Sequence, residues 1–305
     1  MSGGPEVTGG ALSAVDGISA GTLRDYLELT KPRLTSLVAL TALVGYQAGA
    51  SGRSDPAGLV CALVGTTLLA AGGCALNQAM EHELDGRMER TRGRPIPAGR
   101  LQPFESSVFG AALAAVGLLL LLAGTNTPTV LLGITATFTY LAVYTPLKRT
   151  TGLCTLFGAI PGALPPAMGW TAAAGSIEPG TCVLFGMLFL WQLPHFLAIA
   201  WMRRDDYARA GFAILTVFDP DGSATGRQAV LYSISLLPLA LVPAVMGLAG
   251  HLYLVTALAM GLLYTSAALR MAWLRTVESA RGLFLTSLVY LPVVLTVLMI
   301  DRRGY

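Results

Sequence analysis

The chain has 305 residues, of which 54% are hydrophobic and only 12% are charged. A soluble domain carries about 25% charged residues, so this composition excludes a mainly water-facing surface and predicts an integral membrane protein. The net charge is only +3, and the basic residues are scattered between apolar segments rather than gathered on one domain. That scatter argues against nucleic-acid binding.

The predicted elements form an all-α, polytopic membrane protein. Residues 1–22 are rich in Gly, Ser and Ala and lack an apolar run, so we expect a disordered tail before a single transmembrane domain over 23–305. Apolar runs then recur at lengths that suit membrane-spanning helices of about 17–25 residues. We expect about nine such helices, at 34–51, 57–80, 104–124, 128–146, 151–174, 181–202, 228–248, 251–272 and 282–300.

The basic residues predict the orientation of these helices. Seventeen of the 20 Lys and Arg residues fall in segments that alternate to one side of the membrane, and Arg53, Arg302 and Arg303 fall on the other. Cytoplasmic loops carry the excess of Lys and Arg. We therefore expect a multi-pass protein of a bacterial inner membrane with its N-terminus in the cytosol.

A first group of polar residues lies where the second apolar run ends. Asn77, Glu81 and Asp85 are spaced four residues apart, which places them on one face of a helix. Four arginines follow at once: Arg87, Arg90, Arg92 and Arg94. Carboxylate and amide oxygens suit Mg²⁺, and arginines bind phosphate in a bidentate manner. A solvated loop would explain the arginines alone, but polar groups at the end of an apolar helix are costly and usually functional.

A second group follows the sixth apolar run, in the segment WQLPHFLAIAWMRRDDY from Trp191 to Tyr207. His195 and Asp206 would share a face if one helix continued through both, because 11 residues make about three turns. The histidine could ligate iron, act as an acid–base group or simply bond a neighbouring helix. Asp205 and Asp206 supply a second acidic helix end on the side of the first group.

A third group, YLAVYTPLKR from Tyr140 to Arg149, combines two tyrosines with Lys148 and Arg149. The two cations could be no more than topological charges. With Tyr140 and Tyr144 one and two turns deeper, they could also line a diphosphate pocket.

These segments together resemble the UbiA-type superfamily of intramembrane prenyltransferases over about Leu29 to Tyr290. The resemblance is carried by the segments LTKPR at Leu29–Arg33, Asn77–Asp85, RTRGRP at Arg90–Pro95, YTPLKR at Tyr144–Arg149, GAIPGALPP at Gly158–Pro166, WQLPHF at Trp191–Phe196 and RDDY at Arg204–Tyr207. The proline-rich segment and WQLPHF are similar to the branch of that superfamily that farnesylates haem.

The resemblance implies nine transmembrane helices around a central cavity that opens toward the membrane, Mg²⁺ as cofactor, and farnesyl diphosphate and haem b as substrates. It implies catalytic roles for Asn77, Glu81, Asp85 and Asp206. It implies Mg²⁺ ligands among Asn77, Glu81, Asp85, Asp205 and Asp206. It implies substrate contacts from Arg90, Arg94, Lys148, Arg204, Tyr144, His195 and Trp191. It also points to a downstream haem A synthase or to terminal oxidase assembly factors as partners.

Two features depart from the superfamily pattern. Glu81 stands where Asp is usual, and Met202 stands where an acid would precede Asp206 by one turn. Two rival functions remain at this point. A related enzyme could prenylate a phenolic or quinone acceptor with the same diphosphate residues. A transporter is a more distant alternative, and it would place its acids near the middle of the bilayer rather than at one face.

Overall fold

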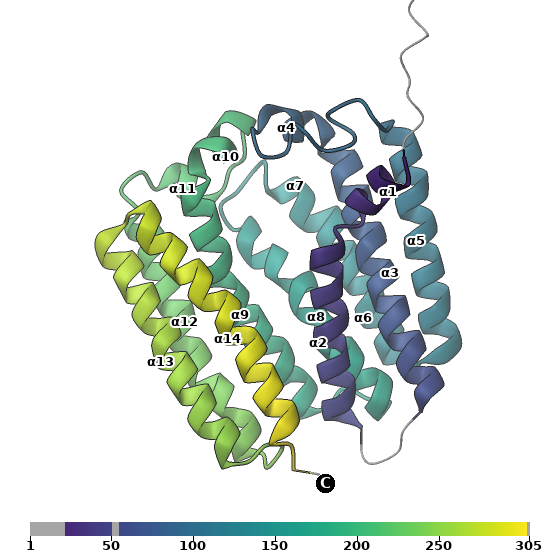
Figure 1. Cartoon of the computed structure of the whole chain (residues 1–305), viewed down its shortest axis with the longest axis vertical. Coiled ribbons are helices and arrows are strands. Elements are labelled where there is room, and N and C mark those ends of the chain that lie inside the picture. The colour runs from purple at the N-terminus through teal and green to yellow at the C-terminus, as the bar shows by residue number, and fades with distance from the viewer. Residues whose placement is uncertain (1–21, 51–54, 304–305) are drawn as a thin grey trace, which may run out of the picture.

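The computed structural model describes residues 22–50 and 55–303, so nearly all of the expected tail, 1–22, lies outside the described residues. The described chain is a bundle of long helices that run roughly parallel, with short helices gathered at one end (Figure 1). The long elements are α2 (Pro32–Gly49), α3 (Pro56–Met80), α5 (Pro103–Gly124), α6 (Thr127–Phe138) with the π-helical η1 (Thr139–Tyr144), α8 (Cys154–Ala174), α9 (Pro179–Met202), α12 (Ser223–Val245), α13 (His251–Leu274) and α14 (Val277–Ile300). The short ones are α1 (Leu23–Leu29), α4 (His82–Arg87), α7 (Thr145–Leu147), α10 (Arg204–Ala210) and α11 (Leu215–Phe218).

Each of the nine predicted ranges overlaps a helical segment of the described chain, with ends that differ by a few residues. Seven of these segments are long and apolar enough to cross a membrane, which makes the chain a multi-pass membrane protein. α2 and α8 are long enough but fall outside that set because neither is apolar enough: α2 contains Arg33 and Gln47, and α8 contains three prolines. The number of nine spans therefore stays a prediction.

The start of α3 and its packing against α5 follow from local sequence. Asp55 caps α3 by accepting a hydrogen bond from the Gly58 amide at 3.0 Å, and Pro56 occupies the first helical position. α3 and α5 then approach closely because glycines face each other. A Cβ added at Gly72 would lie 2.5 Å from the Gly110 carbonyl oxygen. This close contact is typical of helix pairs in membranes.

The helices divide into two groups. α2, α3, α5, α6 and α8 pack together on one side, and α12, α13 and α14 pack with α9 on the other (Figure 1). The largest buried cluster lies in the second group, around the fully buried Tyr253, Tyr264 and Tyr290. α8 and α9 pack against each other and join the two groups.

The two long connections at the hydrophilic end, between α3 and α5 and between α9 and α12, contain short helices. α3 ends at Met80, and α4 follows after Glu81, whose backbone is not helical. In the same way α9 ends at Met202, and α10 follows after Arg203. One helix does not continue from His195 to Asp206, so the condition under which the two side chains would share a face is not met.

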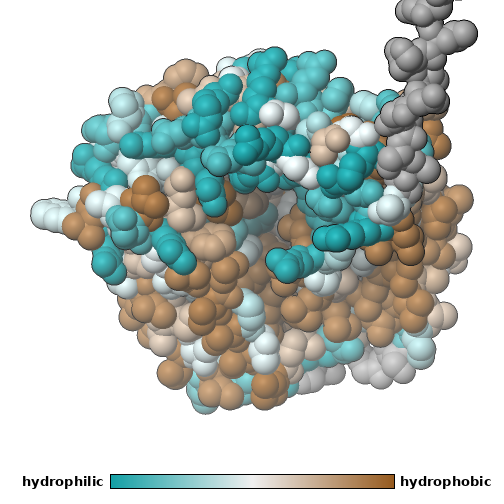
Figure 2. Space-filling model, turned by 45° about the horizontal axis from the view of Figure 1, so that its top comes forward, coloured by the Kyte–Doolittle hydropathy of each residue, from teal (hydrophilic) through white to brown (hydrophobic). Residues whose placement is uncertain are grey.

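Hydrophilic side chains gather at the end of the bundle that carries α1, α4, α10 and α11, whereas the flanks below are hydrophobic (Figure 2). Leucines and other large apolar side chains are exposed along α5, α12, α13 and α14. Such an exposed apolar belt suits lipid rather than water. The polar end is where the three predicted groups of polar residues lie.

Candidate active site

A cavity of about 510 Å³ occupies the space between the two groups of helices. Its walls come from α2, α3, α6 with η1, α8 and α9, and α4 and the segments around Arg94, Lys148 and Phe212 surround its polar end. The lower walls are mostly apolar. The charged lining residues are Lys31, Glu81, Asp85, Arg90, Arg94 and Lys148, so the cavity is a polar site above an apolar chamber.

Glu81 lies at the centre of the polar end. Its Oε2 accepts hydrogen bonds from Lys148 Nζ at 2.6 Å and from Asn77 Nδ2 at 2.9 Å. Asn77 Nδ2 also donates to Thr145 Oγ1 at 3.0 Å, which joins α3 to α7. Glu81 Oε1 is buried and has no hydrogen-bond partner. A buried carboxylate oxygen without a partner is costly, so this atom is available to a ligand.

Asp85, one turn later on α4, forms the second ion pair of the site. Its Oδ2 lies 2.5 Å from Arg94 Nη1, and its side chain is buried. Thr91 Oγ1 donates to the Asp85 carbonyl oxygen at 2.7 Å, which folds the loop after α4 back toward the helix. This turn brings Arg94 to the cavity. Asn77, Glu81 and Asp85 all line the cavity, although the helix is interrupted at Glu81.

Lys31 is a cation of the site that the predicted set omitted. It lines the cavity from the start of α2, where its backbone is left-handed with φ of 50°. Its ammonium group makes no ion pair with the described residues, and burial lowers its pKa. A strained backbone is uncommon for lysine and is typical of functional positions.

Aromatic rings lie directly beneath the cations. The π-helical η1 adds a residue to the turn, and Tyr140 and Tyr144 stack with ring centroids 6.0 Å apart and both line the cavity. Lys148 Nζ lies 4.6 Å from the centre of the Tyr144 ring. Pro146, which cannot donate a hydrogen bond, follows η1 and accounts for the irregular turn.

The second acidic group meets the first at the same end of the bundle. α10 packs against α4, and Arg90 Nη2 donates to the Tyr207 hydroxyl at 2.8 Å. Tyr207 lines the cavity, whereas Asp206 does not: it is buried and paired with Arg209 on its own helix. Asp205 is exposed, and Arg204 stacks on Trp201 and faces the Pro220 carbonyl.

His195 and Trp191 point away from the cavity toward α14. His195 Nδ1 lies 2.6 Å from Ser287 Oγ, and Trp191 Nε1 donates to the Ser287 carbonyl oxygen at 3.0 Å. The two rings stack at 5.2 Å, and Phe284 lies beside the histidine at 5.1 Å. Both side chains are half-buried, and neither lines the cavity, although Gln192 and Phe196 next to them do; this aromatic patch therefore lies on α9 beside the face that lines the cavity.

Three more cavity or site residues escaped the sequence analysis. Gln192, Thr145 and Tyr207 carried no signal by themselves, because each contacts residues far away in the chain. Gln192 follows Trp191, one of the predicted site residues. Adjacent residues lie about 100° apart around a helix, so a helical projection places Gln192 on a different face from Trp191. Lys31 was visible within LTKPR, but its charge was assigned to topology.

The described residues contain no group of three or more His, Cys, Asp and Glu side chains that could hold a metal ion. Asp205 and Asp206 therefore do not join Glu81 and Asp85 in one ligand cluster. Asn77, Glu81 and Asp85 nevertheless fit Mg²⁺, because they offer oxygen atoms along one wall and Glu81 Oε1 lacks a partner. Lys148 and Arg94 neutralise the two carboxylates.

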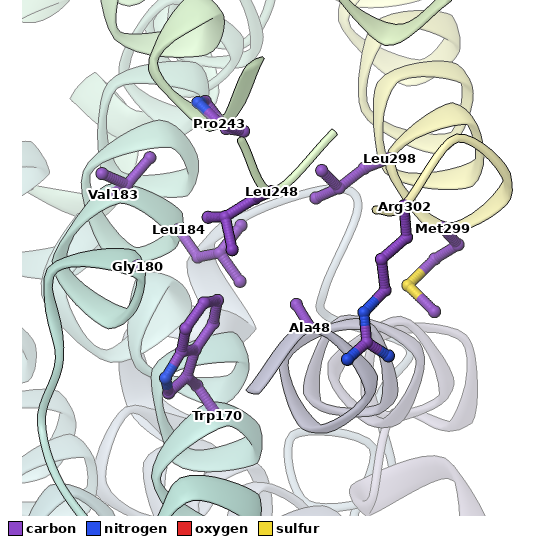
Figure 3. Close-up of a pocket in the computed structure, with 10 residues that line it drawn as sticks. All are labelled: Ala48, Trp170, Gly180, Val183, Leu184, Pro243, Leu248, Leu298, Met299 and Arg302. Carbon is purple, nitrogen blue, oxygen red and sulfur yellow. The ribbon is translucent and has the colours of Figure 1, made fainter. Parts of the chain in front are cut away.

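A second cavity lies at the opposite end of the bundle and is only about 10 Å³ in volume (Figure 3). Trp170, Leu184 and Leu298 surround it, and Arg302 reaches across to donate to the Ala50 carbonyl oxygen. Its size leaves no room for a substrate, so this end is closed by packing. The polar end is the one that offers chemistry.

Three kinds of comparison place the chain among known proteins. The model of the UbiA prenyltransferase family matches residues 38–290. A protoheme IX farnesyltransferase of Solibacter usitatus is 46% identical over 291 residues, which cover 92% of this chain and 100% of the relative. A protein of the same name from Koribacter versatilis is 40% identical over 293 residues, covering 93% and 94% of the two chains.

Two solved structures share the fold. A structure of digeranylgeranylglyceryl phosphate synthase superposes with a TM-score of 0.77 at 18% identity, covering 92% of this chain and 98% of the other. A UbiA homologue from Archaeoglobus fulgidus, bound to GPP and Mg²⁺, gives a TM-score of 0.66 at 17% identity, covering 90% and 99%. At this identity the likeness shows the fold alone.

Proposed function

The chain belongs to the UbiA prenyltransferase family, and from that premise we propose that it transfers the farnesyl group of farnesyl diphosphate to the vinyl group of protohaem IX, giving haem O. The relatives that share 37–46% of its residues along most of the chain carry the name protoheme IX farnesyltransferase. The observation that carries the proposal is the paired Glu81–Lys148 and Asp85–Arg94 cluster above an apolar cavity.

The cations of the cluster bind the diphosphate. Lys31, Arg90, Arg94 and Lys148 line the polar end, where negative charge develops on the leaving group as the bond to the prenyl carbon breaks. Fixed cations placed where charge develops stabilise a transition state most strongly in a site that excludes water. Arg94 and Lys148 are also free to exchange their carboxylate partners for phosphate oxygens.

The apolar walls protect the prenyl cation. Water would capture an allylic cation, so a closed hydrocarbon chamber is needed until the acceptor attacks. Tyr140 and Tyr144 stack on each other near Lys148, and both line the cavity. Aromatic faces attract cations, and these two rings would stabilise the charge as it forms.

Mg²⁺ is the proposed cofactor, with haem b as a substrate. Asn77, Glu81 and Asp85 would hold it, while Asp205 and Asp206 face elsewhere in this arrangement. When bound, Mg²⁺ neutralises phosphate charge and acts as a Lewis acid. The bound metal would also provide the missing partner for Glu81 Oε1.

The acceptor would approach from the side of α9 and α14. His195 and Trp191 offer an imidazole and an indole on that side, and we propose that His195 contacts the haem. The proposed setting is a bacterial inner membrane with the N-terminus in the cytosol. A haem A synthase or terminal oxidase assembly factors would act downstream.

The test supplies purified protein with Mg²⁺, farnesyl diphosphate and either haem b or 4-hydroxybenzoate, and resolves the products by mass. We expect a farnesylated haem that has gained one water and no prenylated phenol, and removal of Mg²⁺ by a chelator should stop the reaction. Prenylation of the phenol alone would refute the proposed acceptor. For His195, haem-loaded His195→Ala with an unchanged Soret band and unchanged turnover would reject the contact.

A further inference from the structure

The face of α3 that lines the cavity runs without interruption from the polar end to the bottom. Each of its lining residues lies three or four positions from another of them: Asn77, Cys74, Gly73, Ala70, Leu69 and Thr66. This spacing keeps them on one face of the helix. The side chains between Asn77 and Leu69 are small, and at Gly73 the Tyr140 ring lies beside the helix, where an added Cβ would be 3.2 Å from Tyr140 Cδ1. A long, narrow apolar group parallel to α3 would therefore pass along this ring.

An apolar cluster closes the bottom of the cavity. Leu69 and Met168 line the cavity and also belong to a buried cluster with Leu121 and Val130. Their side chains converge above Gly133, where an added Cβ would lie 3.0 Å from Leu69 Cδ2 and 3.1 Å from Met168 Cε. Close packing of this kind leaves no space for further chain beneath. We call Thr66, Leu69 and Met168 the cavity floor.

Thr66 gives the floor an unusual polar atom. Its residue is 3% exposed, it lines the cavity, and its Oγ1 has no hydrogen-bond partner. A desolvated hydroxyl without a partner is unfavourable, and a water at the bottom of the cavity would supply one. An apolar ligand that fills the cavity completely would displace that water, so the hydroxyl disfavours ligands that are too long.

The depth of the cavity corresponds to three isoprene units. Thr66 precedes Asn77 by 11 residues, which on a helix is about 16 Å. An extended isoprene unit adds four chain carbons, or about 5 Å with bonds near 1.5 Å. Three units therefore reach the floor from the level of Asn77, whereas a fourth would have to enter the packed cluster.

On the basis of the function proposed above, we infer that Thr66, Leu69 and Met168 select a donor with three isoprene units over longer ones. The recognised feature is the length of the apolar tail. The diphosphate contacts are the same for every chain length, so the floor residues change selectivity and not the chemistry at the polar end.

The experiment compares C10, C15 and C20 prenyl diphosphates with purified protein and Mg²⁺, by the rise in Tm on binding and by turnover with haem. We expect the unmodified protein to prefer C15 over C20 by about tenfold or more, because a single extra methylene in a hydrophobic pocket already gives about tenfold discrimination. Met168→Ala should abolish that preference by opening space. Thr66→Val, which keeps the shape and removes the hydroxyl, should reduce it several-fold. Val130→Ala is the matched control, because Val130 packs in the same cluster but does not line the cavity.

The inference is overturned if the unmodified protein binds C15 and C20 equally, if neither Met168→Ala nor Thr66→Val changes the C20 to C15 ratio, or if Val130→Ala changes it as much. Binding of prenyl diphosphates requires no haem, so the two proposals fail separately. Normal length selection without haem farnesylation would refute only the acceptor. Haem farnesylation without length selection would refute only the floor.

Discussion

Glu81 serves both tasks proposed for the polar end, the positioning of a diphosphate-binding cation and the binding of Mg²⁺. One of its oxygens binds Lys148, and the other has no hydrogen-bond partner and is available to the metal. Glu81→Gln keeps the size of the side chain and removes its charge. We expect kcat for prenyl transfer to fall by about 100-fold or more, the range seen when one preorganised electrostatic group is lost. A turnover assay at saturating Mg²⁺ measures the loss.

Glu83→Gln is the matched control for that change. Glu83 is two residues away on α4, exposed, and outside the cavity lining. It should retain nearly full activity. Equal activity of the two variants would show that the Glu81 charge is not needed for turnover and would remove Glu81 from the site.

Asp85 gives a prediction that separates activity from folding. Asp85→Ala leaves Arg94 without its carboxylate partner, but the change lies at the polar end rather than within the apolar belt. We expect the variant to enter the membrane in normal amounts and to lose turnover. Immunodetection of the variant in membrane fractions measures its insertion, and the turnover assay measures its activity. Mg²⁺-dependent turnover in the variant would refute a role for Asp85 in the site.

Spacing alone predicted the acidic positions, and contacts across the chain determined the rest. The four-residue interval between Asn77, Glu81 and Asp85 placed them on one wall of the cavity. Nothing local pairs Asn77 with Thr145, which lies 68 residues later. Trp191 and His195 stood out by residue type, yet the rotation of α9 turns them toward Ser287, and rotation depends on packing that no single segment encodes.

At the scale of elements, long apolar runs predicted the helices well because lipid demands them. The interruptions at Glu81 and Arg203 were not predicted, since neither carries Pro or Gly. Both interruptions occur where a helix leaves the apolar belt, at the end of the bundle where polar side chains contact one another. The π-helical turn of η1 was equally hidden, although Pro146 marked the place.

Thr145 tests whether η1 and α3 must be held together. Its hydroxyl accepts from Asn77 at 3.0 Å and donates to the Tyr140 carbonyl oxygen at 2.8 Å. Thr145→Val preserves the shape and removes both bonds, so we expect about a tenfold loss of kcat as Asn77 and Tyr140 lose their alignment. Thr145→Ser should restore most of it, and a serine variant as impaired as the valine one would show that packing, not the hydroxyl, matters.

The short helix α1 offers a prediction about acid. Asp25 accepts hydrogen bonds from Thr22 and then from Arg100, and these lower its pKa from 3.8 to about 2. A carboxylate with a lowered pKa stabilises the fold fully above its unfolded pKa and loses that effect as pH falls toward its folded pKa. We expect α1 to detach between about pH 4 and pH 2.

Pepsin, which cleaves at these pH values, can report this detachment by cutting within α1. Asp25→Asn lacks the ionisable group, so it should already be cleaved at pH 4. If the variant and the unmodified protein were cleaved at the same rate at pH 4, the Asp25–Arg100 contact would not hold α1 in place.

For the whole molecule, the site is polar at the hydrophilic end of the bundle and apolar where the surrounding surface is apolar. The surface is hydrophilic at one end and apolar along the flanks (Figure 2), and the cavity has its charged lining residues toward that hydrophilic end and an apolar floor. A donor with a diphosphate head and a hydrocarbon tail has the same asymmetry. The short helices α4 and α10 follow interruptions of α3 and α9 in the same way, and they bring segments more than 100 residues apart to one site, as Arg90 and Tyr207 show.

This asymmetry also determines from which side the substrate arrives, which gives a topological prediction. The excess of Lys and Arg at the hydrophilic end predicts that this end faces the cytosol. In a background without native cysteines, Ala98→Cys and Ser176→Cys place single thiols in exposed loops at opposite ends of the bundle. A membrane-impermeant maleimide should label Ser176→Cys in intact bacterial cells and Ala98→Cys only after the cells are opened. The reverse pattern would place the diphosphate site outside, where a cytosolic prenyl donor could not reach Lys148 and Arg94.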